Sequence, residues 1–458
     1  EPLHVSYRYD LISPLDAPSP FDPPTISRLS AADSFPLDLI NPLPTLPFAT
    51  NSAVEVRQAV AAALPSKRAR QPSAVNTIES SPHRPHVPAD RRLLLWTTPY
   101  SLKTHESAVE AGVSAKMQQS ILEKLLESHQ PETRESYGAG LLRFTQFCDR
   151  HKISEALRMP AHRFLLAAFI ADAVGTVSGK AVRNWLNGLQ LWHVYNDAPW
   201  HGDEGWVPLL KRSADRAGTQ FKRPPRPPIT LAHLRALRAA LDIQTPRGAA
   251  TWAAALTAFW GCRRLGELLI RGSTKFSAQR DTTRSASIRE RVVNGRRVVS
   301  ISLVWTKTTQ LAGGDCLLTE TPEPDSDLCP VRAFNHHLAI NHSPPPGTPL
   351  FAFREDHNWR PLVKQDFIES TASIFAHALL ERVFGHSYRI GGSVELLKAG
   401  VPPEVVMKLG GWSSLCFLIY WRRLEEILPA AITRAWDARI REFARAHGHR
   451  LDANFPID

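Results

Sequence analysis

Apolar residues recur at helical spacing through the middle of the chain, beginning near Ser114. Residues 161–174 and 178–196 are amphipathic on the same period, and no alternating strand pattern separates them. We therefore predict a helical domain over residues 114–220. The positions that define the first two helical faces are Ile121, Leu122, Leu125 and Leu126, followed by Tyr137, Leu141, Phe144 and Phe147.

The first 95 residues carry no sustained helical or strand period, and sixteen of the 37 prolines fall within the first 100 positions. A segment of this composition cannot bury enough apolar surface to fold, so we predict a disordered head over residues 1–95 that is dispensable for any chemistry. Within it, Lys67, Arg68 and Arg70 form a basic cluster of the nuclear-localisation type. A nuclear location is expected on this reading, and an ordinary solvated charge run is the alternative.

A second domain is predicted over residues 231–445, after a stiff, basic linker at 221–230, "FKRPPRPPIT". Thr230 is the expected N-cap of its first helix. A buried helix over 246–260 is followed by β-branched runs on either side of Asn294-Gly295, which predicts a hairpin, and by a strand at 315–319. The rest reads as helical from Pro330 onward. The predicted fold class is mainly α with a small β-hairpin sheet: a helical domain, then an α+β domain.

The charge balance points to an anionic partner. The chain carries 55 Lys and Arg against 44 Asp and Glu, a net charge of +11, which favours nucleic acid first and a membrane surface second. A lipid surface is disfavoured because the chain offers no basic amphipathic helix with aromatic anchors and no apolar run long enough to span a bilayer. The candidates for DNA contacts are the cations at the edge of the helical domain, namely Lys180, Arg183, Lys211 and Arg212.

The five cysteines are an odd number and include no Cys-x-x-Cys pair. This spacing indicates free thiols in a reducing compartment and argues against a zinc site.

Two arginines of the second domain are candidates for binding a phosphodiester. Arg264 follows the buried helix, with Glu267 one helical turn later to orient its guanidinium, and Arg389 lies three residues after His386. Arginine binds the non-bridging phosphate oxygens through two parallel hydrogen bonds, which lysine cannot do. Taken singly, Arg264 is as well explained as a surface charge at a helix end, and Arg389 as a structural partner of a phosphate or carboxylate.

Three further residues supply proton transfer and a nucleophile. Lys307 is expected in a turn between strands, His386 precedes the second arginine, and Tyr420 is, with Tyr388, one of two tyrosines after Trp260. Lysine and histidine transfer protons, and a tyrosine phenol attacks phosphorus when a base and cations stabilise its phenolate. Together with the arginines, these residues predict a phosphoryl-transfer site that needs no metal and no cofactor.

The order and spacing of these residues resemble the tyrosine recombinases (integrases), in the style of those of fungal crypton-type mobile elements. The resemblance covers about residues 115–440. It places Arg264, rather than Arg263, in the first arginine box, and Tyr420 at the nucleophile position eight residues after Trp412. The matching segments are "RRLGEL", "VWTKT", "HSYR" and "LGGW".

The resemblance implies a role for each residue. Tyr420 would attack the scissile phosphate to give a 3′-phosphotyrosine bond, Lys307 would protonate the leaving 5′-oxygen, and His386 would handle the tyrosine proton. Arg264 and Arg389 would neutralise the transition state, and Trp412 would pack against the site.

The resemblance also implies partners. These are double-stranded DNA and further copies of the chain in a tetramer on paired sites, with a C-terminal helix beyond Pro429 either packed on its own domain or passed to a neighbour. Two other functions stay open: a catalytically inactive, recombinase-derived DNA-binding protein, and a type IB topoisomerase, which uses the same chemistry.

Overall fold

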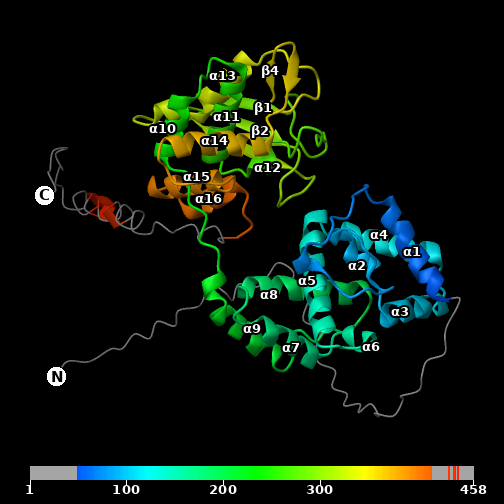
Figure 1. The fold of residues 1–458 in the computed structure, drawn as a ribbon. Helices are drawn as coiled ribbons and strands as arrows, with labels where there is room; N and C mark the ends of the chain where they lie inside the picture. Colours follow the sequence, from blue (N-terminus) through cyan, green and yellow to red (C-terminus); the bar gives the residue numbers. More distant parts are fainter. Residues whose placement is uncertain (1–48, 415–431, 434–436, 440, 443–458) are drawn as a thin grey trace, which may run out of the picture. The chain divides into compact units, whose positions relative to one another are not determined.

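The computed structural model describes residues 49–414, 432–433, 437–439 and 441–442 (Figure 1). The chain forms two compact units, and the boundary between Lys222 and Arg223 falls inside the predicted linker. Among the described residues, none of the helices is both long and apolar enough to cross a bilayer.

Unit 1 is helical throughout the part that the structure describes. Local signals start its helices: the Ser114 hydroxyl accepts a hydrogen bond from the N–H of Met117, and the Ser178 hydroxyl accepts one from the N–H of Ala181. The helices are α1 (Ala49–Ala63), α2 (Arg92–Leu95), α3 (Pro99–Glu110), α4 (Ala115–Glu127), α5 (Pro131–Arg150), α6 (Glu155–Arg158), α7 (Arg163–Ala173), α8 (Gly179–Tyr195) and α9 (Val207–Ala217), with 3-10 turns at Ala74–Asn76, Ala89–Arg91 and Thr219–Phe221.

Helices α5 and α8 pack closely at the centre of unit 1. Two glycines make this possible, because a Cβ on Gly140 would lie 2.4 Å from the carbonyl oxygen of Trp185 and one on Gly188 would lie 2.3 Å from that of Tyr137. Large apolar side chains of α5, including Phe144 and Phe147, fill the core beside them. The predicted helical faces of α4 and α5 are confirmed, although Ile121 is exposed.

The predicted disorder of residues 1–95 is wrong for the part from α1 onward, and residues 1–48 lie outside the described structure. Leu93 and Leu94 are fully buried in the unit 1 core. The buried guanidinium of Arg57 donates to the carbonyl oxygen of Leu94 at 2.9 Å and to the side-chain oxygen of Asn196 at 2.6 Å. The apolar run at residues 93–96 is too short to show a period, and its burial depends on α5 and α8 far along the chain.

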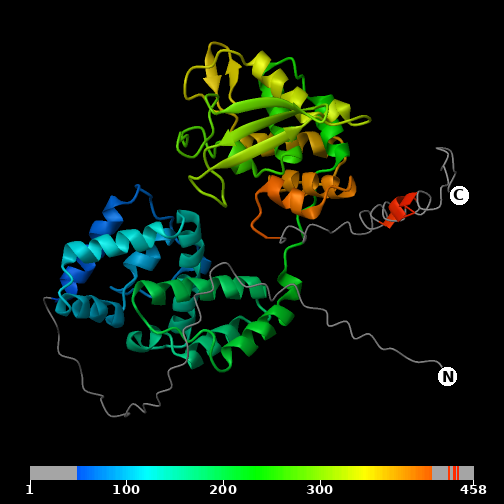
Figure 2. The same cartoon turned by 180° about the vertical axis from the view of Figure 1, so that it is seen from behind.

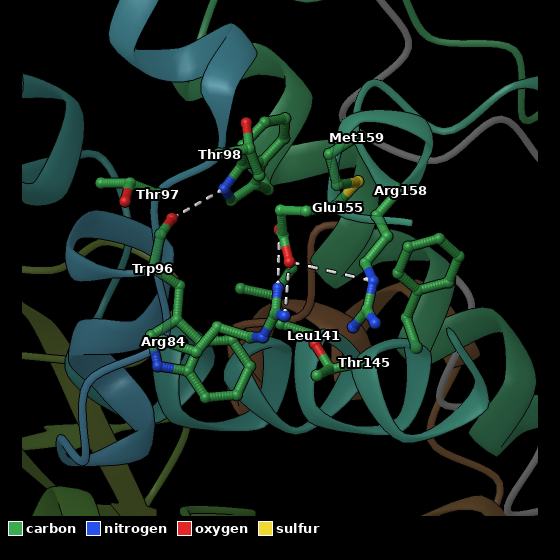
Figure 3. A pocket seen from close by; sticks show the side chains of 11 residues that line it. Arg84, Trp96, Thr97, Thr98, Leu141, Thr145, Glu155, Arg158 and Met159 are labelled. Atoms are coloured by element: carbon green, nitrogen blue, oxygen red, sulfur yellow. Dashed lines mark hydrogen bonds and ion pairs between the residues drawn. The ribbon is translucent and has the colours of Figure 1, made fainter. Parts of the chain in front are cut away.

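A salt-bridge network connects the segment before α2 to α6 (Figure 3). The Arg84 guanidinium donates to both carboxylate oxygens of Glu155, at 2.8 and 2.5 Å, and Arg158 lies on the other side of the same carboxylate at 3.9 Å. The cavity beside them has a volume of about 30 Å³, whereas small-molecule sites enclose roughly 300 Å³ or more. We therefore interpret this network as structural.

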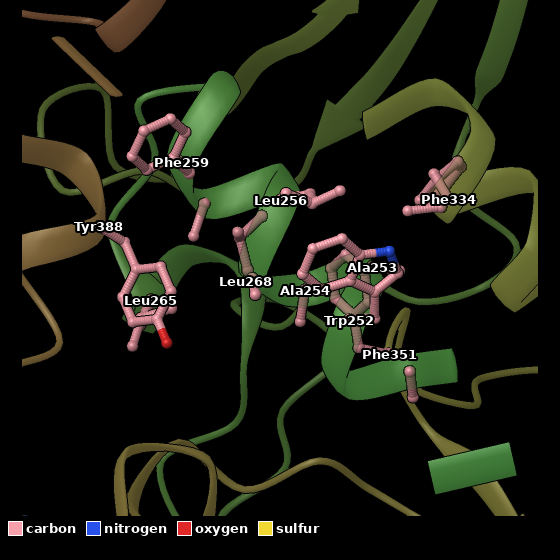
Figure 4. Packing of buried hydrophobic residues seen from close by; sticks show 14 of the residues in the cluster. Trp252, Ala253, Ala254, Leu256, Phe259, Leu265, Leu268, Phe334, Phe351 and Tyr388 are labelled. Carbon is pink, nitrogen blue, oxygen red and sulfur yellow. The ribbon is translucent and has the colours of Figure 1, made fainter. Parts of the chain in front are cut away.

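Unit 2 surrounds the buried helix α11, whose residues from Gly248 to Phe259 are all buried (Figure 4). A three-stranded antiparallel sheet in the order β1-β2-β3 contributes Val299, Ile301 and Leu303 to the same core. The helices are α10 (Leu231–Ala240), α11 (Pro246–Trp260), α12 (Leu265–Leu268), α13 (Pro330–Ile340), α14 (Lys364–His377), α15 (Ser387–Lys398) and α16 (Pro403–Gly410), with a 3-10 turn at Ser326–Leu328. The strands are β1 (Ile288–Val293), β2 (Arg296–Leu303), β3 (Gly314–Thr319), β4 (Phe353–Glu355) and β5 (Asn358–Arg360).

The fold class, mainly α with a small sheet, is confirmed. Asn294 and Gly295 both have positive φ, at 51° and 75°, as the predicted hairpin turn requires. Thr230 caps α10 by accepting from the N–H of His233. The uniformly helical reading after Pro330 is wrong, because β4 and β5 form a hairpin there; strands of three residues are too short to show alternation.

Candidate active site

The candidate residues that the structure describes in unit 2 gather around the C-terminal end of α11. Helices α12 and α15 contact α11, and α16 packs on α15 at one end of unit 2, as Figures 1 and 2 show for α15 and α16. The hydrogen bonds between them join segments as far apart in the sequence as Cys262 and Arg389, which are separated by 127 positions.

Glu267 connects the first arginine to the predicted lysine turn. Its carboxylate is buried in α12, with a side chain 1% exposed, and accepts from the Arg264 guanidinium at 2.7 Å. The same carboxylate accepts from the backbone N–H of Lys307 at 3.2 Å and from that of Arg264 at 3.3 Å. One buried anion therefore holds Arg264 and Lys307 together.

Arg264 and Arg263 have different surroundings, although they are adjacent. Arg263 is buried and donates to the backbone oxygen of Asp315, which fixes it inside the unit. The Arg264 side chain is 25% exposed and retains access to solvent. Arg264, which the motif spacing places in the first arginine box, is thus the one of the two arginines that a ligand can reach.

Lys307 lies in the turn between β2 and β3, as predicted, and is exposed. Its turn is held by hydrogen bonds of its own: Thr306 and Gln310 pair through their backbones at 3.2 and 2.9 Å, and the Gln310 amide donates to the carbonyl oxygen of Lys307 at 3.1 Å. The Trp305 indole N–H donates to Gln310 at 3.1 Å, with the Arg280 guanidinium 4.0 Å above the indole ring. These hydrogen bonds hold the backbone of the turn that presents the exposed Lys307 side chain.

Arg389 is fully buried in α15. One nitrogen of its guanidinium donates to the carbonyl oxygens of Cys262 and Gly410, each at 2.8 Å, and the Trp412 ring lies 3.7 Å from its central carbon. The Arg389 guanidinium is therefore enclosed by the protein, and no part of it is open to solvent. Trp412 thus packs against Arg389, and its part in the reaction stays a prediction.

His386 lies at the N-cap of α15, and its pKa is lowered from 6.5 to about 4. Burial is the largest cause, and the charges of Arg389, Arg264, Arg226 and Lys307 add to it in that order. The imidazole is therefore neutral at neutral pH. Arg226, whose charge also lowers the pKa of His386, is a residue that the motif analysis missed.

The turn after α16 adjoins the lysine turn. Gly411 adopts the left-handed conformation, with φ 68°, and its carbonyl oxygen accepts from the Thr308 hydroxyl at 3.2 Å. Trp412 follows directly. The chain that leads toward Tyr420 thus begins beside Lys307, but Tyr420 itself and most of the predicted C-terminal helix lie outside the described residues, so their roles stay predictions.

The predicted DNA contacts lie on α8 and α9 of unit 1. Lys180 and Arg212 are exposed. Arg183 forms an ion pair with Asp215, and Lys211 forms one with Asp203 at 2.8 Å, so a phosphate would compete with these carboxylates. Their role in DNA binding stays a prediction.

Within the described ranges, no cluster of three or more His, Cys, Asp or Glu side chains could hold a metal ion. Four of the cysteines, Cys148, Cys262, Cys316 and Cys329, are buried free thiols, and the fifth lies outside the described residues. Burial raises the pKa of the Cys262 thiol to about 12, so it is an unreactive neighbour of the site.

No protein-family model matches the chain, and neither does any curated protein. Solved structures similar to it include the XerH site-specific recombinase bound to a palindromic difH substrate, at 14% identity over 74% of this chain and 95% of that one, with a TM-score of 0.44. The Tn1549 transposon integrase in complex with transposon right end DNA has 13% identity over 73% and 98%, with a TM-score of 0.37.

The XerA recombinase has 13% identity over 73% and 100% of the two chains, with a TM-score of 0.29. Because all three TM-scores are below 0.5, the functional argument rests on the site's own residues. The solved structures similar to this chain thus include tyrosine recombinases and integrases.

Proposed function

We propose that the protein is a site-specific DNA recombinase or integrase that cuts and rejoins DNA through a 3′-phosphotyrosine intermediate. One observation carries the proposal: the buried Glu267 carboxylate accepts from the Arg264 guanidinium at 2.7 Å and from the backbone N–H of Lys307 at 3.2 Å, so it joins the two segments that carry these cations. The Arg389 guanidinium donates to the carbonyl oxygen of Cys262, two residues before Arg264, at 2.8 Å, and the charges of all three lower the pKa of His386. Cations gathered around a neutral proton acceptor match the needs of phosphodiester transfer.

Each group has a distinct task in the proposed reaction. The phenol oxygen of Tyr420 forms a bond to the scissile phosphorus as its proton passes to His386. The bond from phosphorus to the 5′-oxygen breaks, and the Lys307 ammonium protonates that leaving oxygen. Arg264 binds a non-bridging oxygen, and Arg389 stabilises the added negative charge through its field. Attack by the freed 5′-hydroxyl on the phosphotyrosine reverses these steps and rejoins the strand without an external energy source.

Phosphate binding would also prepare His386 as a base. In the free protein, the surrounding cations disfavour its protonation. A bound phosphodiester places a negative charge among those cations and offsets their effect, so the pKa of His386 should rise when DNA binds. The site thus gains a better proton acceptor only when its substrate is present.

The proposal also covers the binding partner, the assembly and the location of the protein. Double-stranded DNA is the partner, contacted in unit 1 by Lys180, Arg183, Lys211 and Arg212, and a tetramer on paired sites would let strands exchange. A mobile-element origin and a nuclear location are also proposed. The nuclear location rests on the basic cluster at residues 67–70, where Lys67 forms ion pairs with Asp90 and Glu135 at 3.2 and 2.9 Å.

The test is covalent capture of the protein on a nicked suicide duplex, whose sequence is first selected for binding from a random pool. Wild type should form a protein–DNA adduct, and Tyr420→Phe should bind equally well and form none, because only the attacking oxygen is lost. Tyr388→Phe is the matched control, since Tyr388 is buried in the unit 2 core, and it should keep the adduct. Binding without an adduct by wild type would favour the inactive DNA-binding alternative.

A further inference from the structure

The side-chain amide of Gln310 lies between Trp305 and Lys307 and bonds to both. Its oxygen accepts from the indole N–H of Trp305 at 3.1 Å, and its nitrogen donates to the carbonyl oxygen of Lys307 at 3.1 Å. Because an indole nitrogen can only donate, the first contact determines which end of the amide is the oxygen. The nitrogen end is thereby directed at the backbone of Lys307.

The backbone of Lys307 is consequently held on both sides of its Cα atom. Its N–H donates to the Glu267 carboxylate at 3.2 Å, and its carbonyl oxygen accepts from Gln310. Trp305 is only 8% exposed, and the Arg280 guanidinium lies 4.0 Å from the centre of its ring, so the indole that orients the amide is itself packed. These attachments restrain the point from which the Lys307 side chain extends.

Gln310 has a backbone conformation that glutamine rarely adopts. Its φ angle is 53°, in the left-handed region, where glycine is unstrained and asparagine is enriched. Glycine at this position would avoid the strain but would lose both side-chain hydrogen bonds. Strain of this kind persists only where surrounding contacts over-determine the conformation, and it is concentrated at functional sites. The side-chain contacts of Gln310 therefore matter more at this position than an unstrained backbone.

We propose that Gln310 is a positioning residue for Lys307. It places the ammonium so that its proton passes to the 5′-oxygen as the bond from phosphorus to that oxygen breaks. The inference rests on the proposed function and deepens it, because Lys307 has this task only in that reaction. Gln310 acts through the backbone of Lys307 rather than on the DNA.

The test compares rates of adduct formation on two nicked suicide duplexes that differ in one atom. At the bond that wild type cleaves, one duplex has the natural 5′-oxygen and the other has sulfur. An alkoxide leaves poorly without a proton, whereas a thiol has a pKa of about 8.5, so sulfur takes the bonding electron pair and leaves as a thiolate. Gln310→Gly should be about 10- to 100-fold slower than wild type on the oxygen duplex and close to wild type on the sulfur duplex.

Two further variants separate positioning from folding. Asp356, in the turn between β4 and β5, is exposed and has nearly the same φ angle, 52°. This turn lies at the other end of unit 2 from α15 and α16 (Figures 1 and 2), so Asp356→Gly relieves the same kind of strain and should leave both rates unchanged. Gln310→Asn suits the left-handed backbone and keeps an amide, but it is one methylene too short to reach both partners, so it should repeat the pattern of Gln310→Gly. Thermal unfolding of both Gln310 variants should stay close to wild type, because relieved strain offsets the lost hydrogen bonds.

The possible outcomes distinguish the positioning role from the proposed activity. If wild type forms the adduct and both Gln310 variants match its rate on the oxygen duplex, the positioning role is overturned and the activity stands. A loss of rate that is equally large on the sulfur duplex also overturns the role, because the defect then lies outside the protonation of the leaving group. If wild type forms no adduct on either duplex, the proposed activity is overturned and the positioning role with it.

Discussion

Replacing Glu267 with alanine would test how the site is held together. The Glu267 carboxylate accepts from the Arg264 guanidinium at 2.7 Å and from two backbone N–H groups, those of Arg264 and Lys307, at 3.3 and 3.2 Å. Glu267→Ala removes all three acceptors. It also leaves the Arg264 guanidinium without its carboxylate, in a site where the partner side chain is only 1% exposed.

The loss of stability can be worked out from these contacts. The two backbone hydrogen bonds are long, and together they contribute about 1–2 kcal/mol. Removing one member of a buried ion pair costs about 3–5 kcal/mol, and we take about 2 kcal/mol here because Arg264 is a quarter exposed and water screens its charge. The sum is about 3–4 kcal/mol, which corresponds to a fall in the unfolding temperature of roughly 6–16 °C for a unit of this size.

The assay compares thermal unfolding of Glu267→Ala, Glu267→Gln and Glu355→Ala with that of wild type. Glu267→Gln keeps an oxygen acceptor and should lose about half as much stability. Glu355 pairs with Arg360 at 3.2 Å, but both side chains are at least half exposed, so Glu355→Ala should change stability by no more than about 0.5 kcal/mol. An unfolding temperature for Glu267→Ala close to wild type, or an equal loss in Glu355→Ala, would refute the reasoning.

The remaining predictions concern packing, protonation and the N-terminal boundary. Gly392→Ala should destabilise unit 2 by more than about 2 kcal/mol, because the added Cβ would lie 1.8 Å from a backbone oxygen of α11. Gly266→Ala is the control and should be tolerated, because a Cβ there would have no neighbour within 4 Å. Equal unfolding temperatures for the two variants would count against the close packing at Gly392. The pKa of His386 falls from 6.5 in the unfolded chain to about 4 in the folded one, so the unfolded chain binds the proton first as the pH drops. The unfolding free energy of wild type should therefore decrease more steeply between pH 6.5 and about 4 than that of His386→Asn. Parallel curves of unfolding free energy against pH would contradict this. Deleting residues 1–99 should lower the unfolding temperature of unit 1 far more than deleting 1–48, because the longer deletion removes Leu93 and Leu94 from its core; similar losses in differential scanning calorimetry would show that this segment adds little.

Features that depend on neighbouring residues could be predicted from the sequence. Ser114 and Thr230 start helices because their hydroxyls accept from an N–H only three residues later. The Asn294-Gly295 turn follows from the positive φ angles that these two residues tolerate. The spacing of Arg264 from Glu267 places them one helical turn apart, and their ion pair is confirmed. In each case the interacting residues are no more than four positions apart, so the local sequence pattern is enough to predict the interaction.

The tertiary structure decided which distant groups meet. In the sequence, residues 93–94 belong to a proline-rich segment, but in the structure they are buried in the same core as α5 and α8. Glu267 accepts from the backbone of Lys307 across 40 positions, and Arg389 donates to the carbonyl oxygen of Cys262 across 127. No local window of the sequence contains either contact. Burial also distinguishes the two arginines. Arg389 is enclosed beside the Trp412 ring, whereas the Arg264 side chain is 25% exposed to solvent. The physical reason is that helix and turn geometry follow from local bonding, whereas the electrostatics of a site depend on which segments the core brings together and which of their charges it leaves in water.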